Sequence, residues 1–191
     1  MSAETLGSYG WCKGHQGDIL TIVICMQGCL EVNTMPRGYW LFKSEPSAYS
    51  FQDLLNENES TAEWDGVRNF QARNYLRDEV KVGDGVLFYH SNITPPSVVG
   101  VAVVVREGYP DNTAWDPNSD HPDPRSTADK PLWFMVDIQA EAYLPREVPL
   151  SDLRAMTELE KCSLFTRPRL SIHPISLNEW RKILEKGGQS E

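Results

Sequence analysis

The pattern of hydrophobic and polar positions from residue 39 onward predicts several strands. Aromatic and branched residues fill positions 39–43, and Pro46 follows as a residue that cannot donate to a strand ladder. Residues 86–91 alternate, so that Phe88 and His90 share one face while Tyr89 and Ser91 share the other. Residues 98–105 are almost continuously apolar, which predicts burial on both faces or closure of a barrel. The other predicted strands are residues 132–143 and residues 169–173, the latter ended by Pro174.

Hydrophobic residues three and four positions apart predict short helices between these strands. Ser50 and Asp53 have the spacing of a capping box before a helix over residues 51–56, and Ser176 repeats that pattern before the last helix. In the helix predicted from Asn69 onward, we expect Ala72, Tyr75, Leu76 and Val80 to form the buried stripe. Two further helices are predicted over residues 150–156 and 158–164. Strands and short helices without βαβ alternation predict an α+β domain built on a small curved sheet or barrel, with the helices packed around it.

Residues 108–130 are rich in Pro, Asp, Asn and Ser and predict a long surface loop, because strand signals resume directly afterwards. Four of its residues resemble the ligands of a calcium loop, namely Asp116, Asn118, Asp120 and Asp123. His121 and Thr127 stand where that motif needs glycine and glutamate. No metal site is therefore predicted.

The first 34 residues differ from the rest of the chain. They hold three of the four cysteines and an apolar run, ILTIVICM, at residues 19–26. The lone Lys13 and the acidic Asp18 do not make the basic region of a signal peptide, so export is not predicted. The run fits either an added β-strand or upstream sequence that the mature protein lacks, with Met35 as the working start, and we favour the second. The predicted organisation is an extension over residues 1–34 and one domain over residues 35–191.

Composition and charge limit the possible partners. With 191 residues, of which 40% are hydrophobic, the chain can build one well-packed domain. A net charge of −9 argues against a protein that coats long stretches of nucleic acid, so any such contact is local. No run of eighteen apolar residues occurs, so no membrane partner is predicted. The cysteine spacing fits neither a zinc site nor a disulfide scaffold, which favours a cytoplasmic location, or a nuclear one in a eukaryote.

Residues 64–77, WDGVRNFQARNYLR, carry the strongest candidate site. Gly66 lets the backbone bend sharply after Trp64, and the helix that follows presents unpaired N–H groups at its start. A flat aromatic ring beside a positive helix start suits a nucleobase and its phosphates. The alternative is that Trp64 is a core residue and that Arg73 and Arg77 lie on a solvated face.

Basic and aromatic residues also alternate elsewhere in the sequence. Lys43 and the pair Arg167 and Arg169 add to the arginines of residues 64–77. Aromatic faces stack bases while cations hold the backbone, so this mixture favours binding of a single strand or a flipped base. A second hypothesis is an enzyme that acts on a nucleotide-like ligand, with Lys43, Glu45 and His90 as acid–base groups. No hydrolytic triad, phosphate-binding glycine loop or cofactor motif accompanies them.

Five separate stretches resemble the EVE domain: YWLFKSEP at 39–46, WDGVRNFQARNYLR at 64–77, GDGVLFYHSN at 83–92, YPDNTAWDP at 109–117 and RLSIHPIS at 169–176. The resemblance covers residues 39–184. It implies a PUA-like fold, related to the YTH domains that hold methylated adenine in RNA. It also implies a binding module without chemistry or a cofactor of its own, whose partner is a modified cytosine or adenine in DNA or RNA.

The resemblance further implies a base pocket in which Trp64 is a wall and Lys43 and Ser44 form the floor. The ligand-binding residues that it implies are Lys43, Ser44, Trp64, Val67, Arg68, Asn69, Phe88, Tyr89, His90, Ser91, Arg169, Leu170 and Ser171, and the predicted phosphate contacts are Arg73, Arg77 and Arg167. Arg167-Pro168 departs from the Gly-Ser usual in the family, and Phe70 replaces a common tyrosine. Trp64→Ala is expected to abolish preferential binding while leaving the fold largely intact.

Overall fold

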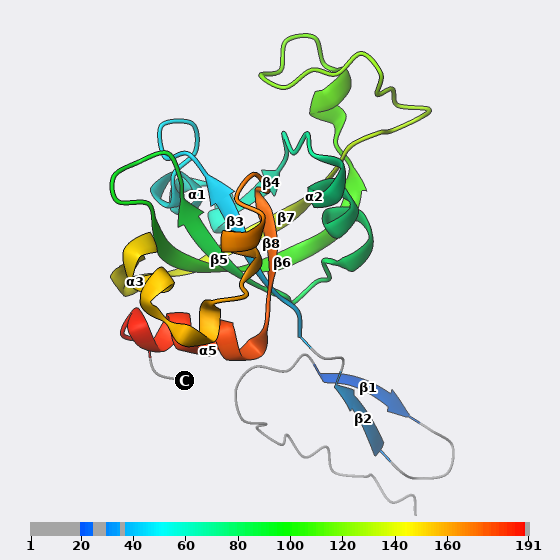
Figure 1. Ribbon diagram of the computed structural model, residues 1–191. Coiled ribbons are helices and arrows are strands. Elements are labelled where there is room, and N and C mark those ends of the chain that lie inside the picture. The colour runs from blue at the N-terminus through cyan, green and yellow to red at the C-terminus, as the bar shows by residue number, and fades with distance from the viewer. Residues whose placement is uncertain (1–19, 25–29, 35–36, 190–191) are drawn as a thin grey trace, which may run out of the picture. The chain divides into compact units, whose positions relative to one another are not determined.

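The structure, a computed structural model, describes residues 20–24, 30–34 and 37–189 (Figure 1). The chain divides into two units, Met1–Pro36 and Arg37–Glu191. In the first unit, β1 (Leu20–Ile24) pairs antiparallel with β2 (Leu30–Thr34). Most of the apolar run at 19–26 therefore forms a strand, as one of its two interpretations predicts. The remainder of that run and Met35 lie outside the described residues.

The second unit is built on a curved sheet of six strands in the order β4-β7-β6-β5-β3-β8 (Figure 1). Strands β3 and β5 are parallel, and every other neighbouring pair is antiparallel. The strands are β3 (Tyr39–Ser44), β4 (Thr61–Trp64), β5 (Gly85–His90), β6 (Ser97–Pro110), β7 (Phe134–Pro149) and β8 (Ile172–Ile175). Among the described residues the sheet is open, with β4 and β8 at its edges.

Short helices connect and cover the strands, which confirms the predicted α+β class. They are α1 (Phe51–Asn56), α2 (Phe70–Asn74), α3 (Leu150–Ala155), α4 (Ser163–Thr166) and α5 (Leu177–Lys186). Both predicted capping boxes are present, at Ser50 before α1 and at Ser176 before α5. A π-helical turn, Tyr75–Glu79, continues α2, and single 3₁₀ turns cover Asn58–Ser60, Asn112–Trp115 and Thr157–Leu159.

Apolar side chains pack on both faces of the sheet. Phe88 belongs to the core on one face, while Leu87 and Tyr89 belong to the core on the other, as the alternation in the sequence predicts. Curvature of the sheet brings side chains of distant strands together. The Trp64 ring of β4 lies 5.3 Å from the Phe42 ring of β3 and 5.4 Å from the Phe88 ring of β5, measured between centroids. Trp64, Phe42 and Phe88 therefore share the core on one face of the sheet.

Several element boundaries differ from the sequence-based expectation. Strand β8 runs through Pro174 instead of ending before it, and this is possible because an edge strand leaves the missing N–H on its unpaired side. Strands β6 and β7 pair as far as Pro110 and Phe134, so the predicted loop starts three residues later, at Asp111. The helix predicted over residues 158–164 is instead a 3₁₀ turn followed by α4. The connection between β6 and β7 projects beyond the sheet (Figure 1).

Candidate functional site

A cavity of about 860 Å³ lies where β3 and β4 end. Its lining comes from four stretches, within residues 43–49, 63–68 and 113–121 and at Ser171. The first two stretches include the carboxyl ends of β3 and β4 and the residues after them. The third belongs to the long connection after β6, and Ser171 immediately precedes β8. Such a volume falls within the range that accommodates small ligands.

Trp64 forms part of the inner lining of this cavity, and only 8% of its surface is exposed. The rest of the ring packs against Phe42 and Phe88, the latter at a right angle. Trp64 is thus mainly a core residue whose remaining surface lies on the cavity. Trp64→Ala would remove core packing as well as cavity wall, so the expectation that this substitution spares the fold does not hold.

Lys43 and Ser44 reach the cavity from the end of β3. The Lys43 ammonium donates to the carbonyl oxygen of Pro168 at 2.9 Å, and burial lowers the pKa of this lysine. The backbone N–H of Lys43 donates to the carbonyl of Ser171 at 2.8 Å, which fixes Ser171 beside the end of β3. The Ser44 hydroxyl donates to the carbonyl oxygen of Tyr49 at 2.6 Å.

The turn after β4 shapes the opposite part of the lining. Gly66 has a φ of +69°, and a Cβ atom there would lie 2.5 Å from Cδ2 of His121. The glycine therefore allows both the turn and the close approach of the imidazole. Asp65 also lines the cavity, and burial together with the charge of Asp111 raises the pKa of this carboxyl group.

Six of the predicted ligand-binding residues line the cavity: Lys43, Ser44, Trp64, Val67, Arg68 and Ser171. The other seven do not line it. Asn69 caps α2 by accepting hydrogen bonds from the N–H groups of Gln71 and Ala72. Phe88 is fully buried behind Trp64, and Tyr89 packs into the core on the opposite face of the sheet.

The remaining predicted residues also lie outside the cavity lining. Nε2 of His90 accepts from the N–H of Phe51, and the Ser91 hydroxyl donates to the carbonyl of Ser44. Leu170 is buried and Arg169 is exposed.

The three arginines predicted to contact phosphate bind other groups of the protein. The Arg73 guanidinium donates to the carbonyl of Leu132 and to the side chain of Asn74. Arg77 forms an ion pair with Asp78 at 2.7 Å, and Arg167 donates to the Tyr75 hydroxyl.

Sequence reasoning missed the part of the lining that comes from the long connection after β6. Thr113 and the four residues from Asn118 to His121 belong to it. The signal was available only in part, since the stretch YPDNTAWDP at 109–117 stands out as a motif while the residues after it have the composition of an ordinary loop. Asp65 was also missed, although it lies beside Trp64.

The acid–base groups of the enzyme hypothesis do not come together. Lys43 and Glu45 line the cavity, whereas His90 faces the start of α1. Within residues 37–189, no group of three or more metal-ligating side chains is positioned to hold an ion. Cys162 is a free, buried cysteine, and burial raises the pKa of its thiol to about 11. Among the helices that the structure describes, none has the length and apolar character needed to cross a bilayer.

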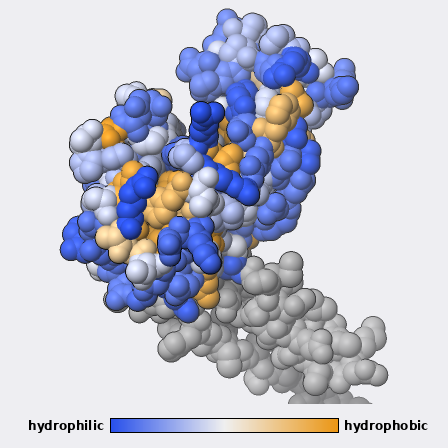
Figure 2. Space-filling view, in the orientation of Figure 1, coloured by the Kyte–Doolittle hydropathy of each residue, from blue (hydrophilic) through white to orange (hydrophobic). Residues whose placement is uncertain are grey.

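Polar side chains dominate the visible surface of the folded unit, and hydrophobic ones emerge in small separate patches (Figure 2). Phe70 is the most exposed of the large hydrophobic residues described, and its ring stacks on Trp133 at 5.0 Å between centroids. Figure 2 shows no continuous apolar face on this side of the folded unit.

Comparisons with known proteins agree with this fold. The family model described as the EVE domain matches residues 38–186. Thymocyte nuclear protein 1 of the mouse is 41% identical over 164 residues, which make up 77% of this chain and 72% of that protein. A structure of a hypothetical protein from Leishmania major has a TM-score of 0.76 and 45% identity, over 80% of this chain and 96% of that chain.

A crystal structure of the human THYN1 protein in complex with DNA that contains 5-methylcytosine also matches, with a TM-score of 0.76 and 38% identity. The match covers 81% of this chain and 99% of that chain. With a family model that spans most of the sequence and relatives of this similarity, this chain belongs to the EVE domain family.

Proposed function

We propose that this chain is a non-catalytic binding module that recognises a modified nucleobase, with a methylated cytosine in DNA as the first candidate. The observation that carries the proposal is the 860 Å³ cavity beside Trp64, in a chain whose fold matches a protein solved with 5-methylcytosine DNA. Modified adenine and RNA remain part of the proposed ligand class, because the cavity chemistry suits any flat heterocycle that carries hydrogen-bonding groups.

The lining offers the contacts that an unstacked base needs. The exposed part of Trp64 supplies an aromatic surface, while Lys43 and the hydroxyl groups of Ser44 and Ser171 supply polar ones. Asp65 adds a carboxylate, which accepts hydrogen bonds from exocyclic amino groups such as N4 of cytosine. An amino-bearing base is therefore favoured over thymine.

A methyl group gives a modest preference by itself. Burial of one methyl group contributes about 0.8 kcal/mol, which corresponds to about fourfold in affinity. Stronger discrimination requires that polar groups of the base are paired at the same time.

The relative solved with 5-methylcytosine DNA supports a binding module, and the position of His90 outside the cavity weakens the enzyme hypothesis. The mouse and human relatives are named as nuclear proteins, and a nuclear location of this chain, if its source is eukaryotic, remains a prediction.

The test compares three short single strands that differ at one position, which holds 5-methylcytosine, cytosine or thymine. Thymine carries the same methyl group as 5-methylcytosine but a carbonyl in place of the amino group, so the set separates methyl filling from amino recognition. We expect 5-methylcytosine to bind about fourfold or more tightly than cytosine, and thymine to bind most weakly of the three. Fluorescence anisotropy at two salt concentrations measures the affinities. Equal affinities for 5-methylcytosine and cytosine would exclude this modification, and formation of a product would favour an enzyme.

A further inference from the structure

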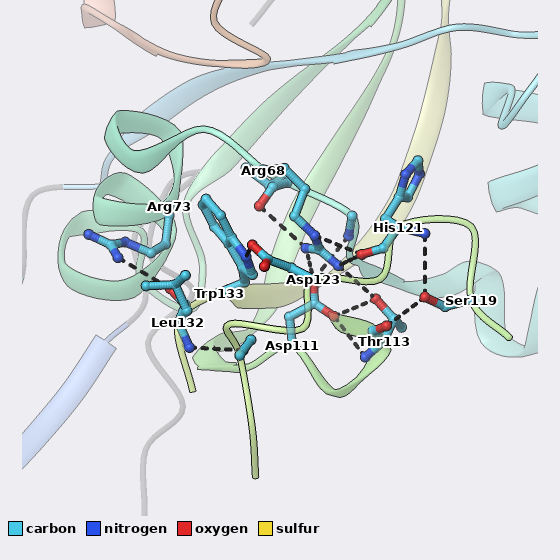
Figure 3. A network of polar contacts seen from close by, with 12 residues as sticks. Arg68, Arg73, Asp111, Thr113, Ser119, His121, Asp123, Leu132 and Trp133 are labelled. Carbon is cyan, nitrogen blue, oxygen red and sulfur yellow. Dashed lines mark hydrogen bonds and ion pairs between the residues drawn. The ribbon is translucent and has the colours of Figure 1, made fainter. Parts of the chain in front are cut away.

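Arg68 lines the cavity, yet its guanidinium group is turned into the protein (Figure 3). Nε and Nη2 donate to the carbonyl oxygen of His121 at 2.9 and 2.5 Å, and Nη1 donates to Asp111 at 2.6 Å. Longer bonds reach the Thr113 hydroxyl at 3.3 Å and the Val67 carbonyl at 3.4 Å. A guanidinium has five N–H donors, so these bonds leave little capacity for a phosphate.

Asp111 is the partner that neutralises this arginine. Its side chain is fully buried and accepts from Arg68, from the N–H of Gly66 at 3.1 Å, and from both the N–H and the hydroxyl of Thr113 at 3.0 and 2.6 Å. Burial alone would raise the pKa of this carboxyl group, but the hydrogen bonds from Thr113 and Arg68 outweigh it and the pKa is lowered. The lowered pKa favours the charged carboxylate of Asp111 beside Arg68.

These contacts hold the stretch of residues 113–121, which we call the outer wall. It supplies five lining residues but lies outside the sheet, and it is bonded mainly to itself, for example from the Ser119 hydroxyl to the carbonyl of Thr113 at 2.5 Å. Arg68 donates to the carbonyl of His121 at the far end of this wall (Figure 3). The His121 ring lies against Gly66, in the turn after β4.

We infer that Arg68 is a positioning residue that, together with Asp111, holds the outer wall against the turn at Gly66, and that preference for a modified base depends on this wall. The inference rests on the proposed function. It assigns Arg68 to the construction of the pocket and not to the neutralisation of phosphate charge.

The two roles of Arg68 give opposite results for one substitution. If Arg68 contacted phosphate, Asp111→Asn would free the guanidinium and remove a negative charge, so DNA of any sequence would bind more tightly. If Arg68 holds the wall, the NH₂ group of the asparagine would replace an oxygen that accepts hydrogen bonds and would face N–H or O–H donors, so the wall would loosen. Arg68→Lys separates the roles as well, because lysine keeps the charge but offers only three donors without the planar fork.

The experiment uses the full chain with Asp111→Asn and Arg68→Lys, and a control for each. Arg154→Lys repeats the arginine change on α3, whose Leu153 belongs to the core on the other face of the sheet. Asp129→Asn repeats the charge change in an exposed turn between Thr127 and Lys130. Affinities for the 5-methylcytosine and cytosine strands are measured, and hydrogen–deuterium exchange is followed in the peptide that covers residues 113–123.

We expect both test variants to bind the two strands with nearly equal affinity, and the exchange of the wall amides to accelerate about tenfold or more. Both controls should match the parent protein in preference and exchange. Tighter binding by Asp111→Asn, a preference retained by Arg68→Lys, or unchanged exchange of the wall would each overturn the inference. Equal affinity of the parent protein for the two strands would instead exclude 5-methylcytosine as the ligand, and wall exchange would then decide the role of Arg68.

Discussion

Gly66 determines the local shape of the cavity through two separate constraints. Its φ of +69° is a conformation that residues with a side chain adopt at a cost of about 1–2 kcal/mol. The His121 ring also occupies the space that a side chain would need. Gly188 offers a comparison within the same chain, because its φ is +82° but its nearest neighbour, Cβ of Pro145, would lie at an ordinary 3.5 Å.

Gly188→Ala should therefore lower the free energy of unfolding by about 1 kcal/mol, while Gly66→Ala should lower it by more and should also displace His121. Urea unfolding measures the first effect for both variants. Exchange of the amides in residues 113–123 measures the second, which we expect only for Gly66→Ala. Equal losses of stability in the two variants would show that the contact with His121 carries no energy.

At the scale of elements, His173 joins β8 to α4. Nε2 of His173 donates to the carbonyl oxygen of Leu170 at 3.0 Å, since a carbonyl can only accept, and Nδ1 then accepts from the Ser163 hydroxyl at 2.9 Å. Burial, with the nearby charge of Lys43, lowers the pKa of His173 to about 4. The neutral imidazole therefore helps to hold the segment before β8, which includes the cavity residue Ser171.

The lowered pKa predicts a loss of stability in mild acid. The unfolded chain takes up the proton near pH 6.5 and the folded chain only near pH 4, so the stabilisation is complete above pH 6.5 and declines as the pH falls toward 4. We expect the free energy of unfolding to fall by roughly 1–2 kcal/mol between pH 7 and pH 5. His90, whose pKa burial also lowers, adds to this trend, so the decisive comparison is with His173→Gln. This variant should show a flatter dependence on pH, and a dependence as steep as that of the parent would assign the effect to other groups.

Elements with a strong hydrophobic pattern could be predicted from the sequence, and those defined by their neighbours could not. Residues 39–43 and 86–91 are rich in aromatic and branched residues and appear as β3 and β5. Strand β4 was missed because TAEW is short and carries little pattern, and it is a strand through its pairing with β7. The extent of β8 was wrong because the effect of Pro174 depends on whether the strand lies at an edge.

The same distinction applies to the candidate site. Lys43, Ser44 and Trp64 stand in motifs next to strand ends, where the sequence itself indicates a site. His121 lines the cavity from the connection after β6, and its carbonyl contacts Arg68, 53 positions earlier in the chain. No local pattern encodes such a contact, because it depends on the position of a long connection relative to the whole sheet.

At the scale of the whole molecule, negative charge exceeds positive charge. The net charge is −9, and the ion pairs of Arg68 with Asp111 and of Arg77 with Asp78 use part of the positive charge. We therefore expect weak recognition of a long phosphate backbone, and an affinity that depends mainly on the base that enters the proposed cavity.

The dependence of affinity on salt should accordingly be shallow. For two to four phosphate contacts, each adding about −0.7, the slope of log K against log salt concentration on a single strand should lie between about −1.4 and −2.8. Titrations of the 5-methylcytosine strand between low and physiological salt measure it. A slope steeper than about −4 would indicate a broad electrostatic surface in place of a local site.

The cavity lining is drawn from four stretches that span the folded unit, from Lys43 near its start to Ser171 near its end. No short peptide cut from this chain can reproduce that arrangement, since each stretch owes its place to strands contributed by the others. Ligand binding therefore reports whether the whole sheet is assembled. Two fragments produced by cleavage within the connection after β6 should not bind the ligand separately, and should regain binding only when they reassemble the entire sheet.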